Sequence, residues 1–272
     1  MTQPAPLFDS ARIGRYRARA SKHYADHAFL NERAWEDVLN RLDSVTRSFE
    51  TGMLINPYTP NHAGLPAFIE EKKEIPAMTA QSQDLVISLM HLHLENDLPG
   101  ALHTILQGLR PDGLFLGALF GERTLYELRA SLLQAESEYC GGAQARIIPF
   151  AEIKALGGLM QRAGFALPVV DVDRVTVRYP SVTALMHDLR GMGQSNPLAG
   201  PVRSLRRDVL GRTEEIYRER FGTKDGLLAA SFEIVHMCGW APHESQQKPL
   251  KPGSAQISLH EVFGDKVQKE KP

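Results

Sequence analysis

The distribution of apolar and polar residues over residues 83–121 follows a strand–helix–strand pattern. Asp84–Leu89 is a short apolar run, which suits a buried strand and is too short for a helix. Leu98–Leu109 carries apolar residues at helical spacing, and Pro99 suits the first turn because its missing N–H would have no partner there. Leu114–Phe120 is a second apolar run that follows turn residues. The pattern predicts a βαβ unit with two parallel strands, covered on both faces.

Segments with helical or strand periodicity lie on both sides of this unit. Two helices are predicted between Leu7 and Ser48, and a short strand at Gly52–Ile55. Ala67–Glu74 is highly charged and bounded by prolines, so we expect at most two helical turns there. After the βαβ unit, the pattern predicts helices at 124–138, 149–163, 181–189 and 202–221, and strands at 165–179 and 227–240.

Three regions follow from these elements. Residues 1–48 form a predicted helical extension, and residues 49–243 form an α/β domain. Residues 244–272 are rich in Gln, Lys and Pro, and we expect them to be a disordered tail.

The composition is that of an ordinary soluble globular protein, with 43% hydrophobic and 23% charged residues. The net charge of −1 gives no general reason to expect nucleic acid or an anionic membrane as a partner. No apolar run approaches the ~20 residues that a bilayer crossing needs. Cys140 and Cys238 are the only cysteines, which favours a reducing compartment and argues against a disulfide framework or a cysteine zinc site. We therefore expect a cytoplasmic protein, or one of the mitochondrial matrix if the source is eukaryotic. The arginines of the first helix are interpreted as a solvated face; the alternative is a site for phosphate or for an acidic partner.

His91 and His93 are the main candidates for chemistry. They lie two residues apart at the end of the predicted central strand, so their side chains are expected to share a face. In an open α/β sheet, ligands bind outside the carboxyl ends of the strands, where this pair and the following Asn96 and Asp97 fall. The functional interpretation is a substrate-facing or proton-transfer pair; the alternative is a polar strand end satisfied by loop backbone. As a metal site the pair lacks further ligands, so no metal is predicted.

Three long phrases of the sequence carry a family resemblance: Asn96–Arg129, Phe150–Ser181 and Ala184–Leu198. The chain resembles a methyltransferase-like family that includes a mitochondrial respiratory complex I assembly factor known as an arginine hydroxylase. The likeness runs from about Leu7 to Trp240 and into the tail. It implies a Rossmann-like class I S-adenosylmethionine-dependent methyltransferase fold, in which Asp84 would open the fourth strand and Leu114–Phe120 would be the fifth. It also implies S-adenosylmethionine as cofactor and a protein partner, a subunit of complex I.

The sequence departs from that family where the cofactor would bind. Members of the superfamily hold the cofactor with a glycine-rich loop after the first strand, because glycine lets the backbone approach a ligand closely. Here the first strand is followed by Asn56, two prolines and a tyrosine, with Gly64 as the one glycine. The candidate cofactor-binding residues are Asn56, Gly64 and Asp84, and either Glu70 or Glu71 could replace the acidic residue that binds ribose.

Chain length leads to the same conclusion. Two further strands and three crossovers need roughly 45 residues, which is more than the segment between Pro57 and Gln83 contains. The sheet is therefore expected to lack the second and third strands of the family and to have its first strand at or near the edge. Two functions remain open. One is a methyltransferase-like enzyme that modifies a complex I subunit; the alternative is a catalytically degenerate member without cofactor binding that acts as a binding or assembly partner.

Overall fold

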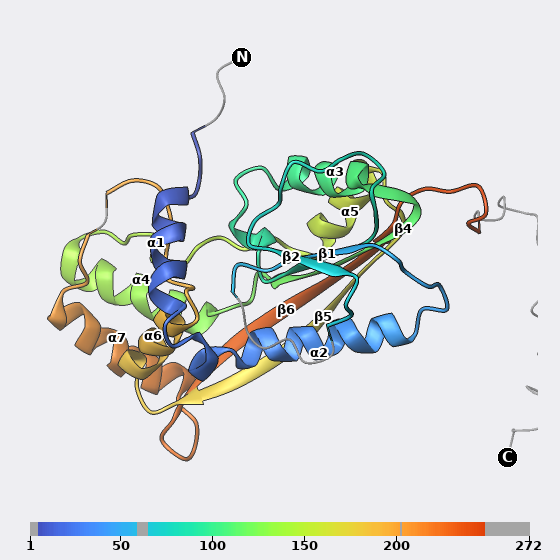
Figure 1. Ribbon diagram of the computed structural model, residues 1–272. Coiled ribbons are helices and arrows are strands. Elements are labelled where there is room, and N and C mark those ends of the chain that lie inside the picture. Colours follow the sequence, from blue (N-terminus) through green and yellow to red (C-terminus); the bar gives the residue numbers. More distant parts are fainter. Residues whose placement is uncertain (1–4, 59–64, 202, 248–272) are drawn as a thin grey trace, which may run out of the picture. The chain divides into compact units, whose positions relative to one another are not determined.

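A six-stranded sheet with the order β2-β1-β3-β4-β6-β5 organises the structure, a computed structural model that describes residues 5–58, 65–201 and 203–247 (Figure 1). The strands are β1 (Gly52–Ile55), β2 (Ile69–Lys72), β3 (Gln83–Leu89), β4 (Leu109–Phe120), β5 (Ala166–Tyr179) and β6 (Leu228–Trp240). The α-helices are α1 (Ser10–Ala20), α2 (Phe29–Asp43), α3 (Leu98–Gly108), α4 (Tyr126–Cys140), α5 (Ile153–Ala163), α6 (Val182–Gly191) and α7 (Arg207–Phe221). Two 3₁₀ helices are η1 (Tyr24–His27) and η2 (Leu92–Leu94).

The predicted βαβ unit is formed by β3, α3 and β4. The two strands pair in parallel, with Leu85 opposite Leu114 and Leu89 opposite Ala118. Pro99 lies in the first turn of α3, as its missing N–H suggests. β6 then pairs antiparallel with β4 and with β5, which gives the sheet one reversed strand next to its second edge. The predicted fold class, a Rossmann-like α/β sheet shortened on one side, is confirmed.

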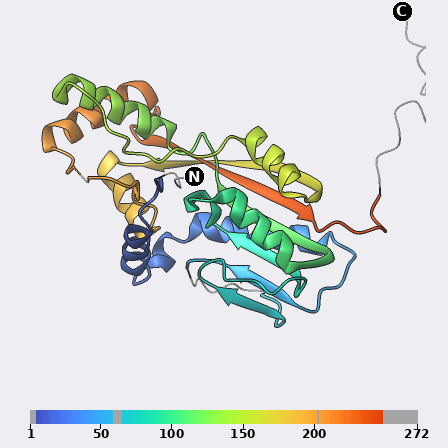
Figure 2. The same cartoon turned by 90° about the horizontal axis from the view of Figure 1, so that it is seen from above.

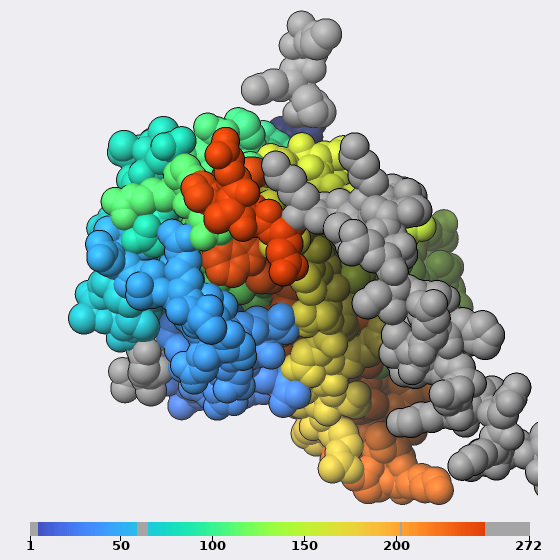
Figure 3. Space-filling model, turned by 90° about the vertical axis from the view of Figure 1, so that its right-hand side faces the viewer, coloured from blue at the N-terminus to red at the C-terminus, as the bar shows by residue number. Residues whose placement is uncertain are grey.

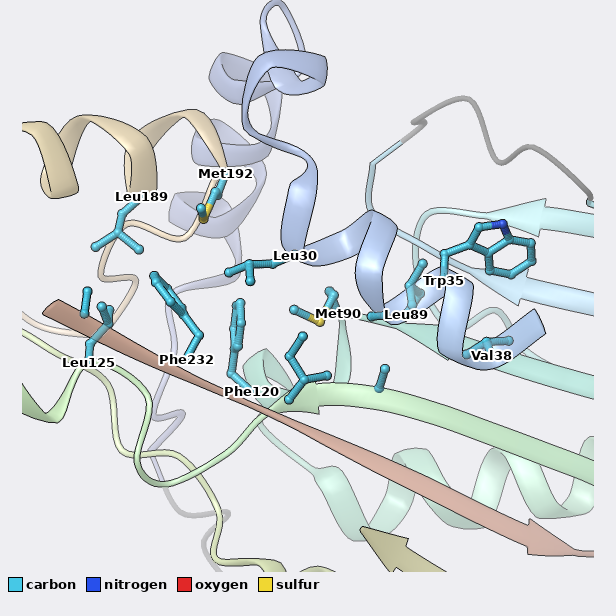
Figure 4. Packing of buried hydrophobic residues seen from close by; sticks show 14 of the residues in the cluster. Leu30, Trp35, Val38, Leu89, Met90, Phe120, Leu125, Leu189, Met192 and Phe232 are labelled. Carbon is cyan, nitrogen blue, oxygen red and sulfur yellow. The ribbon is translucent and has the colours of Figure 1, made fainter. Parts of the chain in front are cut away.

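Alternation along the strands divides the core into two layers. Leu85, Ile87 and Leu89 of β3 pack in one cluster with Trp35 and Val38 of α2 (Figure 4). Val86 of β3 faces the opposite way, into a second cluster below α3 and α5. Because both faces are covered, β3 and β4 read as nearly continuous apolar runs rather than as alternating sequences.

The segment Ala67–Glu74 differs from the sequence-based expectation. Ile69–Lys72 is a strand, not a short helix, and it pairs in parallel with β1. The prediction that two strands are missing is therefore corrected, because β2 adds one strand outside β1; the prediction that the first strand lies at or near the edge is confirmed, because β1 is next to the edge strand. A four-residue strand with exposed Glu70 and Glu71 is a typical edge strand, because short length and charge discourage pairing with other chains.

The long strand β5 forms the opposite edge of the sheet. It appears as a yellow strip at the surface beside the blue α2 (Figure 3). Arg41 of α2 donates hydrogen bonds from both Nη atoms to the Asp171 carboxylate, each 2.8 Å long. Arg33 also pairs with Asp173 through two hydrogen bonds, donated by its Nε and Nη2 atoms. These ion pairs join the predicted N-terminal extension to the sheet.

Residues 1–242 form one compact unit and residues 243–272 a second. Of the second unit, residues 243–247 are described, so most of the predicted tail lies outside the described residues. None of the helices in the described parts combines the length and the apolar character that a membrane crossing requires.

Candidate functional site

The order of strands reverses between β1 and β3, since β2 follows β1 in sequence but lies on its other side. A reversal of this kind creates a crevice outside the carboxyl ends of the two strands, where α/β proteins bind ligands. Asn56 follows β1 there, and His91 follows β3. The N-terminal helix α1 and the end of α6 lie beside these strand ends (Figure 2).

His91 belongs to the turn after β3. Met90 has a positive φ of 50°, which ends the strand and starts η2. The Nη2 atom of Arg17 lies 3.1 Å from His91 Nδ1. A guanidinium only donates, so Nδ1 accepts and the imidazole proton is on Nε2, 2.7 Å from the Glu95 carboxylate. Arg17 thus holds His91 in one tautomer and orientation.

His93 lies in η2, and its side chain contacts residues other than those that contact His91. Its Nε2 is 3.0 Å from Oε1 of Gln194, to which it donates. Its ring makes an edge contact with Phe120, with centroids 5.1 Å apart. The pKa of His93 is lowered to about 3, mainly by burial; the bond to Gln194 opposes the shift, and the nearby Arg17 and His91 contribute to it. The imidazole is therefore neutral at physiological pH, and its buried Nδ1 has no hydrogen-bond partner in the described part of the chain. It can accept a hydrogen bond, but it is too weak a base for efficient proton transfer.

The expectation that His91 and His93 share a face is wrong. It assumed strand alternation, but the strand ends at Leu89 and both residues lie in the turn and 3₁₀ helix that follow. They remain near neighbours, each held by a residue from a distant part of the chain.

Aromatic side chains fill the crevice above β1. Tyr58 is 3% exposed, and its ring stacks on Tyr24 with centroids 4.1 Å apart. Burial raises the pKa of Tyr58 to about 12, although the positive charge of Arg17 acts in the opposite direction. A Cβ atom on Gly193, which has a φ of +70°, would lie 2.2 Å from Tyr58 Oη. The glycine therefore allows the 191–196 loop to close over the tyrosine.

The described residues at the switch point do not fit an adenosyl cofactor. Such a cofactor needs open backbone at the end of the first strand, and here the buried rings of Tyr58 and Tyr24 lie at that place. Asn56 is buried as well, and its Oδ1 accepts a hydrogen bond from the Tyr58 N–H. The described residues thus use this space for packing.

The other candidates have identifiable structural contacts. Asn96 accepts a hydrogen bond from the Phe8 N–H and donates one to the Phe8 carbonyl, and these two bonds hold the N-terminal segment in place. Asp97 caps α3 by accepting from the Gly100 N–H. Asp84 lies at the opposite, amino end of β3, where Arg110 and the Thr51 N–H donate to its carboxylate. Gly64 lies outside the described residues.

Sequence reasoning missed the residues that organise the site. The solvated face expected for the arginines of the first helix is wrong for Arg17, whose side chain is only 12% exposed. Tyr24, Tyr58 and Gln194 carry no local signal of function. The one hint was the arginine-rich first helix, since a helix with several arginines next to buried histidines is well placed to orient them.

The geometry also shows how α1 and η1 are fixed over the crevice. His27 Nδ1 and the Tyr179 hydroxyl both contact the Asp188 carboxylate of α6 at 2.5 Å. Arg19 of α1 donates to the Ser195 hydroxyl at 2.9 Å. Helix α1 and η1 are thus attached by two side-chain contacts, one to α6 and one to the loop that follows it, while Tyr179 of β5 holds the same Asp188 carboxylate.

Comparison with known proteins gives two groups of relatives. The mitochondrial arginine-hydroxylase NDUFAF5 of Danio rerio is 47% identical over 179 residues, which are 66% of this chain and 56% of that protein. The malonyl-[acyl-carrier protein] O-methyltransferase of Halorhodospira halophila is 32% identical over 182 residues, 66% of this chain and 60% of that protein. No model of a known protein family matches the chain.

The chain is a homologue of these proteins, and the resemblance to a methyltransferase-like family is confirmed. It spans little more than half the length of the curated relatives it matches. Among solved structures, phosphoethanolamine N-methyltransferase 2 of Haemonchus contortus in complex with S-adenosylhomocysteine is 12% identical. The aligned part covers 77% of this chain and 53% of the Haemonchus contortus chain, with a TM-score of 0.40.

Proposed function

We propose that this chain is a methyltransferase-like factor that acts on a protein subunit during the assembly of respiratory complex I. The observation that carries the proposal is the 47% identity to a mitochondrial arginine-hydroxylase over 179 residues, which are 66% of this chain. The expected location is the cytoplasm in a bacterium and the mitochondrial matrix in a eukaryote.

Deletion of the gene tests this proposal. Membrane NADH dehydrogenase activity is expected to fall in the deletion strain and to return when the wild-type gene is supplied on a plasmid. Succinate dehydrogenase activity of the same membranes serves as a control, because it reports on the respiratory chain without complex I. Normal NADH dehydrogenase activity in the deletion strain would remove the assembly role.

Within this role, S-adenosylmethionine is the cofactor that the O-methyltransferase relatives suggest. A second candidate is a family member that works without that cofactor, as a binding partner during assembly. One observation favours the second candidate: Tyr58, stacked on Tyr24, takes the space at the end of β1.

Thermal unfolding with and without S-adenosylmethionine separates the two candidates. A ligand at 100 times its dissociation constant stabilises a protein by about 2.7 kcal/mol. The filled crevice predicts no shift in the melting temperature at millimolar S-adenosylmethionine. A clear, saturable rise in the melting temperature would instead identify the chain as a cofactor-binding methyltransferase.

A further inference from the structure

An apolar cavity of about 260 Å³ lies beside the candidate site, between α4, α6 and the 146–150 segment. Figure 4 shows Leu125, Leu189 and Phe232, three of its lining residues, which come from different elements. Leu128 and Leu132 of α4 complete the apolar wall on one side. Because Met186, Ile147 and Leu205 are only half-buried, part of this apolar surface reaches solvent.

The cavity has a polar, positively charged neighbour. A second hollow of about 310 Å³ shares Arg146 and Asn196 with it and is also lined by Arg12, Tyr16 and Arg203. Its lining residues include three arginines and no carboxylate. Arg146 pairs with Glu136 and Arg12 with Asp9, whereas the exposed Arg203 has no ion pair with any described residue. This second hollow, called the mouth below, therefore favours anionic groups over cationic ones.

The cavity is also connected to the buried histidine. Phe120 and Phe150 line it, and the ring of His93 contacts both, with centroids 5.1 Å and 6.1 Å apart. Gln194, which holds His93, is a lining residue as well. A group seated in the cavity would thus lie against the side chains that position His93.

We propose that this cavity binds an apolar side chain of the protein substrate, from a segment that carries acidic residues beside it. The proposal rests on the proposed function, because it names the part of a protein subunit that the chain would recognise. The size agrees with this occupant: about 260 Å³ lies below the range of 300–1,000 Å³ typical of cofactor and drug-sized ligand sites. Buried apolar anchors surrounded by complementary charge are also the usual way in which proteins bind peptide segments.

Calorimetric titration of the full chain with short synthetic peptides tests the proposal. The first probe is a capped peptide with Leu-Phe at its centre and two glutamates on each side. The second replaces Leu-Phe with Ser-Ser, and the third replaces the glutamates with lysines. We expect the first peptide to bind at least about tenfold more tightly than either of the others. Decanoate is titrated separately, because a free fatty acid shares the chemistry of an apolar group with a carboxylate.

Two substitutions locate the binding. Met186→Glu places a charge in the apolar wall and is expected to lower the affinity for the first peptide by about tenfold or more. Arg203→Glu reverses one charge at the mouth and is expected to weaken binding of the first peptide by about threefold, with a smaller salt dependence. Leu133→Glu on the exposed face of α4 and Arg162→Glu on α5 are the matched controls. Circular dichroism and melting temperature establish that each variant is folded.

The outcomes separate this inference from the proposed function. Equal affinity for the three peptides, no binding at millimolar concentration, or binding that folded Met186→Glu leaves unchanged would each overturn it. Decanoate that displaces the first peptide and binds more tightly would do so as well, because the cavity would then be a lipid site. If gene deletion lowers NADH dehydrogenase activity and Met186→Glu restores it fully, the inference fails while the assembly role stands. If deletion has no effect but the peptide binds as expected, the assembly role fails alone.

Discussion

The two ends of the central strands solve the problem of buried polar groups in opposite ways. At the amino end, the Asp84 carboxylate accepts hydrogen bonds from the N–H groups of Glu50 and Thr51 and from Arg110. At the carboxyl end, His93 Nδ1 and Ser88 Oγ are buried and have no hydrogen-bond partner in the described residues. The Asp84 carboxylate at the amino end therefore has several hydrogen-bond donors, whereas these two buried atoms at the carboxyl end have no partner among the described residues.

The difference teaches where to look for function. Unsatisfied buried polar groups cost free energy, so a protein retains them where they serve a purpose other than stability. Asp84 has the acidic character expected of a ligand-binding residue, but its contacts are those of a residue that stabilises the fold. His93 has fewer contacts and lies beside an apolar cavity.

The largest effect is expected at the amino end of the central strands, where Asp84 lies. Asp84→Ala removes the acceptor of several hydrogen bonds and leaves Arg110 without its carboxylate, so the free energy of unfolding should fall by about 3 kcal/mol. Urea denaturation measures the change. Asp97→Ala is the control, because it removes one helix cap and should cost about 1 kcal/mol. Equal losses for the two variants would contradict the structural importance of Asp84.

The second prediction concerns the contact between the 191–196 loop and Tyr58. Gly193→Ala should lower the free energy of unfolding by about 2 kcal/mol, because alanine is strained at positive φ and its Cβ would meet Tyr58. Gly141→Ala has closely similar backbone strain at φ +68° with nothing within 4 Å, and should cost about 1 kcal/mol. The difference between the two variants in urea denaturation measures the clash alone. Identical losses would mean that the 191–196 loop does not rest on Tyr58.

The third prediction uses the lowered pKa of His93, which burial displaces from 6.5 to about 3. A histidine with a lowered pKa in the folded state takes up its proton more readily when unfolded. Its contribution to stability is therefore complete above pH 6.5 and is lost as the pH falls towards the folded pKa. In this window the wild type should lose up to about 1.4 kcal/mol more per pH unit than His93→Gln. Parallel stability curves between pH 7 and pH 5 would show that His93 is not buried in neutral form.

Most of the sheet could be predicted from local sequence. The strands β3, β4, β5 and β6 are long or strongly apolar, and turn residues and helical periodicity mark the elements between them. The strand β2 could not be recognised, because Ile-Glu-Glu-Lys has the charge of a surface helix and becomes a strand only through pairing with β1.

The site was harder to predict for a geometric reason. Arg17 lies 74 residues from His91 in sequence, and Gln194 lies 101 residues from His93. Pairs at such separations leave no periodic pattern. The same applies to Tyr24 and Tyr58, whose stacking depends on how the N-terminal helices fold back over the sheet. The fold therefore follows from local patterns, whereas the site depends on long-range packing.

The attachment of Phe8 has a practical consequence for work with this protein. Phe8 is buried, its N–H and carbonyl are both bonded to Asn96, and its neighbours Leu7 and Asp9 bond to the 197–199 backbone. A shortened version that starts after Phe8, or a purification tag fused directly onto it, would disturb these bonds, which hold the start of the arginine helix α1. A tag with a flexible spacer upstream of Leu7 would leave these bonds in place, and recombinant versions should be designed accordingly.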